Sequence, residues 1–243
     1  MFSEIAHLGN FSPEFIMCDY EKGLRNAATI FFPLCTVSGC LFHFINAVKQ
    51  RVCRKHKKEY EHITYADGVP QYSPTKLLVR RLQGLAYVPP SDVEACFAQV
   101  IANVSPDLQT SLADEIDYFN ITWVSGVTVG QTTITPAIHP PASWNVRFRT
   151  LAKMNRINNP CESFHSKFSI FVPGNGKPTV WNFLDSMKKF QADTNNAIAS
   201  MHQGNKPSRR KAREVKKNKR IFAATKEYQR MDLIPYLDWI MDL

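Results

Sequence analysis

Three features that would each define a class of protein are missing from this sequence. It contains no uninterrupted apolar run of about 18 residues, which a membrane-spanning helix requires. No basic segment followed by an apolar one opens the chain, as a secretory signal would. The six cysteines are scattered, without the dense spacing of a disulfide scaffold. We therefore expect an intracellular protein with reduced thiols and no membrane partner.

What the chain does contain is a large apolar fraction and an excess of positive charge. Its 243 residues are 44% apolar and 12% aromatic, enough for one large core or two small ones. Thirty Lys and Arg stand against 21 Asp and Glu, which gives a formal net charge of +9. Such a balance favours polyanionic partners, nucleic acid first and anionic membrane surfaces second.

The most informative stretch pairs two strand-to-helix passages near the beginning of the sequence. An apolar run at 15–18 stops at Asp19, and a helical pattern follows at once. A second passage runs through 35–39 into a helix from Cys40. Ligands of open α/β sheets usually lie at the carboxyl ends of strands. The pattern therefore predicts that a buried strand places the Asp19 carboxylate in a site.

These passages also carry a family resemblance. The segments Ile16-Met17-Cys18-Asp19-Tyr20-Glu21 and Gly39-Cys40-Leu41-Phe42-His43-Phe44 resemble the catalytic region of Mutator-like (MULE) transposases. That family has an RNase H-like fold and an Asp/Asp/Glu active site. The later run 156–165 resembles the segment with the family's last carboxylate, which corresponds to Glu162. The resemblance covers roughly residues 1–200.

The resemblance implies an α/β fold, predominantly α-helical: a partial RNase H-like core, from the strand of the second Asp onward, with an α-helical insertion. We expect the partial core at 1–60 and the helical insertion with a return loop at 61–147. The C-terminal part of the core, which carries Glu162, is expected at 148–203, and a basic helix with an apolar tail at 204–243. The family's first Asp lies upstream of Asp19, and we expect this chain to lack it.

By the same resemblance, Asp19 and Glu162 are the candidate catalytic and metal-binding residues. An intact parent enzyme would use Mg²⁺ or Mn²⁺, held by carboxylates, to cut and join DNA. Because the first Asp is expected to be absent, we expect the chain to be an inactive fragment or domesticated remnant. The alternative is a non-enzymatic, basic nuclear protein derived from a transposase that binds DNA or protein. A basic helical domain without any nucleic-acid role is a third hypothesis.

Two motifs near Asp19 allow more than one interpretation. Glu21 is either a substitute metal ligand or an ordinary acidic charge at a helix N-terminus. The spacing of Cys40 and His43 suggests zinc, with Cys18 and Cys35 as further ligands. Structural zinc sites usually show two clear ligand pairs, and only one is present here. We therefore expect a packed thiol and imidazole rather than zinc.

The residues around Glu162 are also candidates for a supporting role. Asn159 precedes it in a segment where Pro160 ends the extended chain and a helix begins. His165 lies one helical turn after Glu162, where it would contact a phosphate or orient the carboxylate. An ordinary packed or exposed histidine is the equally simple alternative.

Two basic segments, at 49–58 and 208–220, are the candidate nucleic-acid-binding regions. On a helix, most of the basic residues of the second segment fall on one face. A solvated helix face or a nuclear localisation signal would explain the same pattern. The candidates are Arg51, Arg54, Lys55, Arg209, Arg210, Arg213, Lys216, Lys217 and Arg220. We expect DNA as the partner, a second copy of the chain as a further one, and a nuclear location.

Four other segments have clear local patterns. Residues from Pro74 to about Val124 are helical throughout, and Asp67-Gly68-Val69-Pro70 marks a loop. Residues 125–147 are rich in Gly, Thr and Pro and are also expected to form a loop. The apolar tail at 233–241 is expected to dock on the body of the protein or on a partner. No zinc-finger or helix-turn-helix pattern is present to recognise bases.

Overall fold

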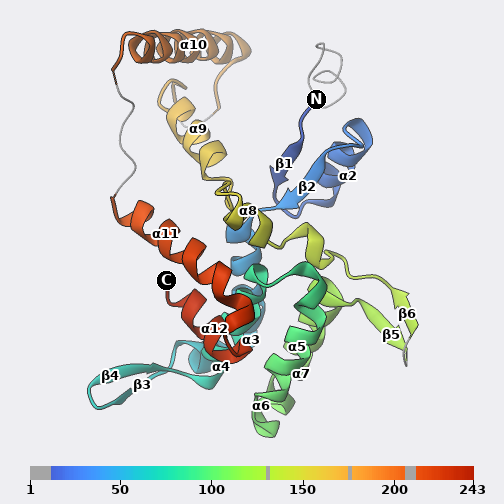
Figure 1. Cartoon of the computed structure of the whole chain (residues 1–243). Coiled ribbons are helices and arrows are strands. Elements are labelled where there is room, and N and C mark those ends of the chain that lie inside the picture. The colour runs from blue at the N-terminus through green and yellow to red at the C-terminus, as the bar shows by residue number, and fades with distance from the viewer. Residues whose placement is uncertain (1–11, 130–131, 175–176, 206–211) are drawn as a thin grey trace. The chain divides into compact units, whose positions relative to one another are not determined.

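The structure, a computed structural model, describes residues 12–129, 132–174, 177–205 and 212–243 (Figure 1). Within these ranges the chain is predominantly helical, as expected, and its strands form small two-stranded sheets. It divides into two units: residues up to Ile157 together with Lys217–Leu243, and residues Asn158–Lys216. The first unit contains parts of all four segments expected from the sequence.

The two predicted strand-to-helix passages are present in the first unit. Strands β1 (Phe15–Cys18) and β2 (Thr36–Gly39) pair in parallel, with Cys18 opposite Gly39. Parallel strands need a crossover connection, which α2 (Lys22–Phe31) provides. After β2 the chain enters α3 (Leu41–Glu61). Because the strands are parallel, Asp19 and Cys40 follow two strand ends at the same edge of this small sheet.

The core of the first unit is helical and aromatic. Phe44 of α3 stacks on Trp144, with ring centroids 4.4 Å apart, and meets Trp123 edge-on at 5.1 Å. Helix α3 packs along α4, and helical elements follow as far as Val124, as predicted. They are α4 (Pro74–Gly84), η1 (Leu85–Tyr87), η2 (Pro90–Asp92), α5 (Val93–Ala102), α6 (Pro106–Ser111), α7 (Ala113–Phe119) and the π-helical turn η3 (Asn120–Val124).

Two β-hairpins lie where the sequence predicted loops. Strands β3 (Ile63–Ala66) and β4 (Val69–Tyr72) pair antiparallel about Asp67 and Gly68, whose φ angles of 51° and 76° suit a tight hairpin turn. Strands β5 (Val127–Val129) and β6 (Thr132–Thr135) pair within the segment expected to be a return loop. The described rest of that segment includes the short helical turn η4 (Pro141–Ser143). The β-branched threonines there favour a strand pair rather than an irregular loop.

The end of the chain returns to the first unit. Helix α12 (Leu233–Met241) packs against α4, and its Leu237 side chain is fully buried. Arg81 of α4 donates two hydrogen bonds of 2.8 Å to the carboxylate of Asp238. The prediction that the apolar tail docks on the body is therefore confirmed. The adjoining elements are α8 (Arg147–Leu151), α11 (Ala212–Lys226) and η5 (Glu227–Arg230).

The second unit consists mainly of two helices joined by aromatic contacts. Helix α9 (Asn159–Ser169) and helix α10 (Val180–His202) meet where the Phe168 ring lies 5.5 Å from the Phe190 ring. Ser186 is the buried residue of α10, and many of the apolar side chains of this helix are exposed. No helix in the described parts of either unit is long and apolar enough to cross a membrane.

Candidate functional site

Asp19 lies directly after β1, where the sequence predicted a site. Its side chain is 47% exposed, and Oδ1 lies 3.0 Å from Nδ1 of His43. His43 is in the first turn of α3, so the two residues come from neighbouring strand ends. Nδ1 makes no aligned hydrogen bond to any described residue, so the contact is a close approach of the two side chains rather than a directed bond. This edge therefore presents an accessible carboxylate with an imidazole beside it.

Close backbone contacts fix the two strand ends. The Cys40 amide donates to the Cys18 carbonyl at 3.0 Å, and the Leu41 amide donates to the Arg156 carbonyl at 2.9 Å. A β-carbon on Gly39 would lie 2.3 Å from the hydroxyl of Tyr20, so only glycine fits there. The Tyr20 ring thus packs directly on the backbone of β2, which holds the Asp19 backbone in place.

A buried arginine lies behind this edge. Arg149 of α8 is 2% exposed and donates from Nη2 to the Gly39 carbonyl at 2.8 Å. Its Nε and Nη1 have no hydrogen-bond partner among the described residues. Burial lowers the pKa of Arg149 to about 10. The guanidinium of Arg25 lies 5.6 Å from the Tyr20 ring, which adds a second positive charge.

These arginines place positive charge near the strand edge, and both carry nitrogen atoms without a hydrogen-bond partner among the described residues. The buried hydroxyl of Tyr20 also lacks a hydrogen-bond partner among the described residues, and burial raises the pKa of this hydroxyl. Buried polar atoms without partners are uncommon in native proteins and call for an explanation such as a bound ion or water. Arg149 was not predicted from the sequence, because no residue pattern around it indicates burial.

The other candidates near Asp19 occupy unremarkable positions. Glu21 precedes α2 as an exposed residue, and its side chain makes no capping bond. Cys40 is fully buried before the first turn of α3. Across the described parts of the chain, no group of three or more His, Cys, Asp or Glu residues is arranged to hold a metal ion.

Glu162 lies in the second unit, in the first turn of α9. It is exposed and lines a shallow hollow with Ser166, Lys167 and Ile170. Asn159 is the first residue of the same helix, and the His165 ring lies 5.5 Å from that of Phe164. Asp19 belongs to the first unit and Glu162 to the second, so their convergence remains a prediction. As exposed carboxylates, both offer the oxygen ligands that Mg²⁺ and Mn²⁺ prefer.

The first basic segment lies at the C-terminal half of α3 and is partly engaged within the protein. The Arg51 guanidinium lies 4.7 Å from the centre of the Tyr118 ring, and its Nε is buried. Lys55 Nζ lies 2.7 Å from an oxygen of Asp114, whereas Arg54 is exposed. These contacts leave Arg54 as the candidate of this segment with the least protein contact.

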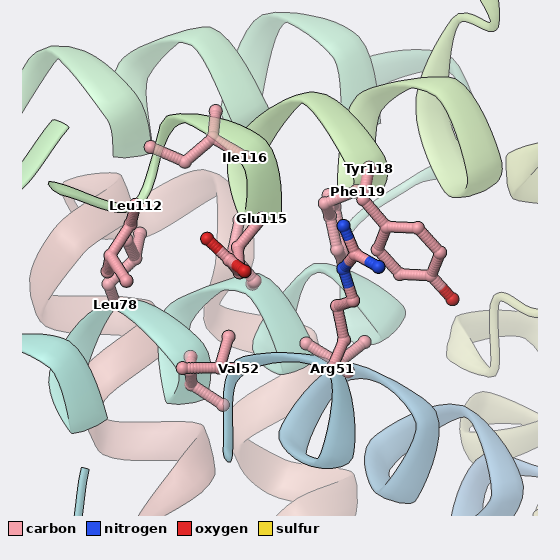
Figure 2. Close-up of a pocket in the computed structure, with 11 residues that line it drawn as sticks. Arg51, Val52, Leu78, Leu112, Glu115, Ile116, Tyr118 and Phe119 are labelled. Carbon is pink, nitrogen blue, oxygen red and sulfur yellow. The ribbon is translucent and has the colours of Figure 1, made fainter. Parts of the chain in front are cut away.

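Arg51 also borders a small pocket between α3, α4 and α7 (Figure 2). Figure 2 shows Arg51 and Glu115 among apolar neighbours that include Val52 and Phe119. The cavity measures about 10 Å³, which accommodates one water molecule and no larger ligand. Oε1 of Glu115 has no hydrogen-bond partner among the described residues, while Oε2 lies 3.6 Å from Nε2 of His56. A single water therefore fits this pocket better than a substrate.

The second basic segment runs into α11. Arg213, Lys216, Lys217 and Arg220 are all exposed on this helix, whose buried residues are Ile221, Ala224 and Thr225. Arg209 and Arg210, the other predicted binding residues of this segment, lie outside the described residues. The basic side chains of α11 are thus accessible to solvent, as phosphate binding would require.

Comparison with known proteins adds no assignment, since no family model, curated protein or solved structure matches the chain.

Proposed function

We propose that the chain is part of, or descends from, a Mutator-like DNA transposase, with Asp19 and Glu162 as its metal-binding carboxylates. The observation that carries the proposal is the position of Asp19. It is an exposed carboxylate directly after a parallel strand, 3.0 Å from a histidine in the helix that follows the neighbouring strand. The sequence motifs that resemble the family are the ones that contribute these two residues.

The local fold supports this proposal. A parallel pair of strands joined by a helix is a unit from which an RNase H-like sheet would be built. Ligands of such sheets bind beyond the carboxyl ends of the strands, where Asp19 lies. The cationic environment supplied by Arg149 and Arg25 would favour a phosphate group near this edge.

In the reaction of an intact parent enzyme, these residues would bind and orient. Asp19 and Glu162 would hold Mg²⁺ or Mn²⁺, which would stabilise charge on the attacking and leaving oxygens of a phosphodiester. The His43 ring, whose Nδ1 lies 3.0 Å from Oδ1 of Asp19, would help to position that carboxylate. The exposed basic residues of α11 would hold the DNA backbone through its phosphates.

The proposal is tested by titrating Mn²⁺ into the purified chain and following the heat of binding. We expect binding that is lost in both Asp19→Asn and Glu162→Gln, because a shared site needs both carboxylates. Asp107→Asn, an exposed residue of α6, is the matched control and should bind as the original chain does. Circular dichroism confirms that each variant is folded. Undiminished binding in both site variants would refute the assignment.

A second candidate function is DNA binding without catalysis, in a protein that is nuclear. The exposed basic residues of α11 favour it. The test measures duplex DNA affinity at several salt concentrations for the original chain and for Lys216→Gln, Lys217→Gln and Arg220→Gln. Each lost phosphate contact should reduce the slope of the logarithm of the affinity against the logarithm of the salt concentration by about one. Salt-dependent DNA binding by a folded chain that binds no Mn²⁺ would favour this candidate over the first.

A further inference from the structure

Helix α10 carries a regular apolar stripe that its own unit leaves exposed. The stripe residues are spaced alternately by four and three positions, the heptad period of a coiled-coil seam. Its apolar members are 41–72% exposed. The stripe consists of Val180, Leu184, Met187, Gln191, Thr194, Ile198 and Met201. A strict 3.5-residue period over a helix of 23 residues points to another helix as the occupant of this face.

Helix α9 contacts a different face of α10. The rings of Phe183 and Phe190 lie 5.7 and 5.5 Å from that of Phe168. The Ser186 hydroxyl donates to the Phe171 carbonyl at 2.9 Å, and Asp193 pairs with Lys167 at 2.7 Å. These α10 residues lie beside the stripe rather than on it. The contacts that join α9 and α10 therefore do not explain the stripe.

We propose that α10 pairs with α10 of a second copy of this chain as an antiparallel coiled coil. The order of residues along the stripe favours a copy of itself. Antiparallel pairing centred between positions 192 and 193 places Leu184 opposite the partner's Met201 and Met187 opposite the partner's Ile198. Gln191 then faces the partner's Thr194, so both polar layers fall at the centre with apolar layers on either side. Central polar layers of this kind fix the register of a coiled coil.

Charge favours the antiparallel over the parallel orientation. The sequence that follows α10, residues 206–216, contains six basic residues and one acidic residue. Parallel pairing would bring both basic segments to the same end of the helix pair. Antiparallel pairing attaches them at opposite ends, about 34 Å apart, which exceeds the screening length of roughly 8 Å at physiological salt.

The size of the stripe sets the expected strength of the dimer. The stripe is a strip about 32 Å long and about 10 Å wide on each copy. That area is well below the roughly 800 Å² per partner of a stable interface. We therefore expect monomer and dimer to exchange at micromolar concentrations. Residues 158–216 hold ten basic and four acidic residues, so added salt should strengthen this pairing, in contrast to DNA binding.

Sedimentation of the full chain, from about 1 to 100 µM, tests the proposal without reference to DNA or metal. We expect a concentration-dependent dimer that Ile198→Glu abolishes. Asn196→Glu adds the same charge two residues away, outside the stripe, and should dimerise normally. Circular dichroism confirms that both variants keep their helices. A chain that remains monomeric throughout, as it would if another part of the same chain covered the stripe, overturns the proposal, and so does unchanged dimerisation of Ile198→Glu.

Disulfide trapping tests the orientation. In a Cys161→Ser background, which removes the exposed native thiol, we compare Leu184→Cys alone with Leu184→Cys combined with Met201→Cys. Antiparallel pairing predicts rapid disulfide-linked dimers only in the double variant, since two copies of position 184 would lie about 26 Å apart along the helices. Rapid linkage of the single variant would show a parallel pair and overturn the antiparallel assignment.

Discussion

The two units differ in what they do with their aromatic side chains. In the first unit, Trp144 is fully buried and stacked on Phe44, and its Nε1 donates to the carbonyls of Trp123 and His139. In the second unit, Trp181 is 78% exposed at the start of α10. The first unit thus has a core that accounts for its fold. The second holds together through a row of phenylalanines and leaves apolar side chains of α10 exposed.

The largest effect should come from breaking the aromatic core. Trp144→Ala removes a stacked, hydrogen-bonded ring and leaves a cavity, which should lower the free energy of unfolding of the first unit by about 3–5 kcal/mol. Trp181→Ala makes the same change at an exposed position and should alter it by less than about 0.5 kcal/mol. Urea unfolding followed by circular dichroism measures both. Equal losses would show that Trp181 is buried in solution.

A smaller effect should come from crowding the strand edge beside Asp19. Gly39→Ala places a β-carbon against the Tyr20 ring, and moving that ring should cost roughly 1–3 kcal/mol. In Gly23→Ala, within α2, the nearest atom to the new carbon lies 3.8 Å away. That control should stabilise the helix slightly, because alanine is the better helix former. Thermal unfolding distinguishes the two, and a stabilised Gly39→Ala would contradict the packing described.

Acid should weaken the first unit through His139. This ring lies 4.9 Å from Tyr20 and 4.8 Å from Trp123, and its burial lowers the pKa to about 4 from 6.5. Between pH 6.5 and 4 the unfolded chain takes up a proton that the folded chain does not. The free energy of unfolding should therefore decrease as the pH is lowered from 6.5 to 4. We expect a decrease of about 1–2 kcal/mol, after allowance for the partial solvent access of the ring.

Replacing the histidine checks this assignment. His139→Gln should flatten the dependence of the unfolding free energy on pH between 6.5 and 4. His165→Gln, at an exposed position of α9, is the matched control and should retain the dependence. An unchanged pH profile in His139→Gln would assign the acid sensitivity to other groups.

The sequence was sufficient where a local pattern and the fold agree. The apolar run 15–18 ends at Asp19, and the structure places β1 at the same residues. The pairing of β1 with β2, which the sequence did not specify, brings His43 to Asp19. The tail at 233–241 was recognised from its apolar residues alone, since α12 has a clear face to bury against α4.

Other features needed tertiary information or a signal that was overlooked. Asp67-Gly68 is a strong hairpin sequence, and with the flanking tyrosines it would have predicted β3 and β4 instead of a loop. Arg149 is buried because α8 happens to pack behind Gly39, which no sequence period encodes. The separation between Asp19 and Glu162 also depends on tertiary packing, since the two residues are 143 positions apart in the sequence.

The smallest expected effect comes from a single hydrogen bond in the second unit. Ser186 is 2% exposed, and its hydroxyl contacts the carbonyls of Phe171 and Asn182 at 2.9 and 2.7 Å. Ser186→Ala leaves the Phe171 carbonyl without this donor, a loss of about 1 kcal/mol. We expect amide exchange in α10 to accelerate about fivefold and that in α3 to remain unchanged.

Ser169→Ala is the control for loss of a serine hydroxyl that makes no contact between the two helices. The Ser169 hydroxyl bonds to the Ser166 carbonyl within α9 and touches no residue of α10 in the described contacts, so exchange in α10 should be unaffected. If Ser186→Ala instead accelerates exchange in α3 as well, the two units unfold as one. The phenylalanine row would then be one part of a larger cooperative structure. Acceleration confined to α10 means that the second unit opens independently of the core around Trp144.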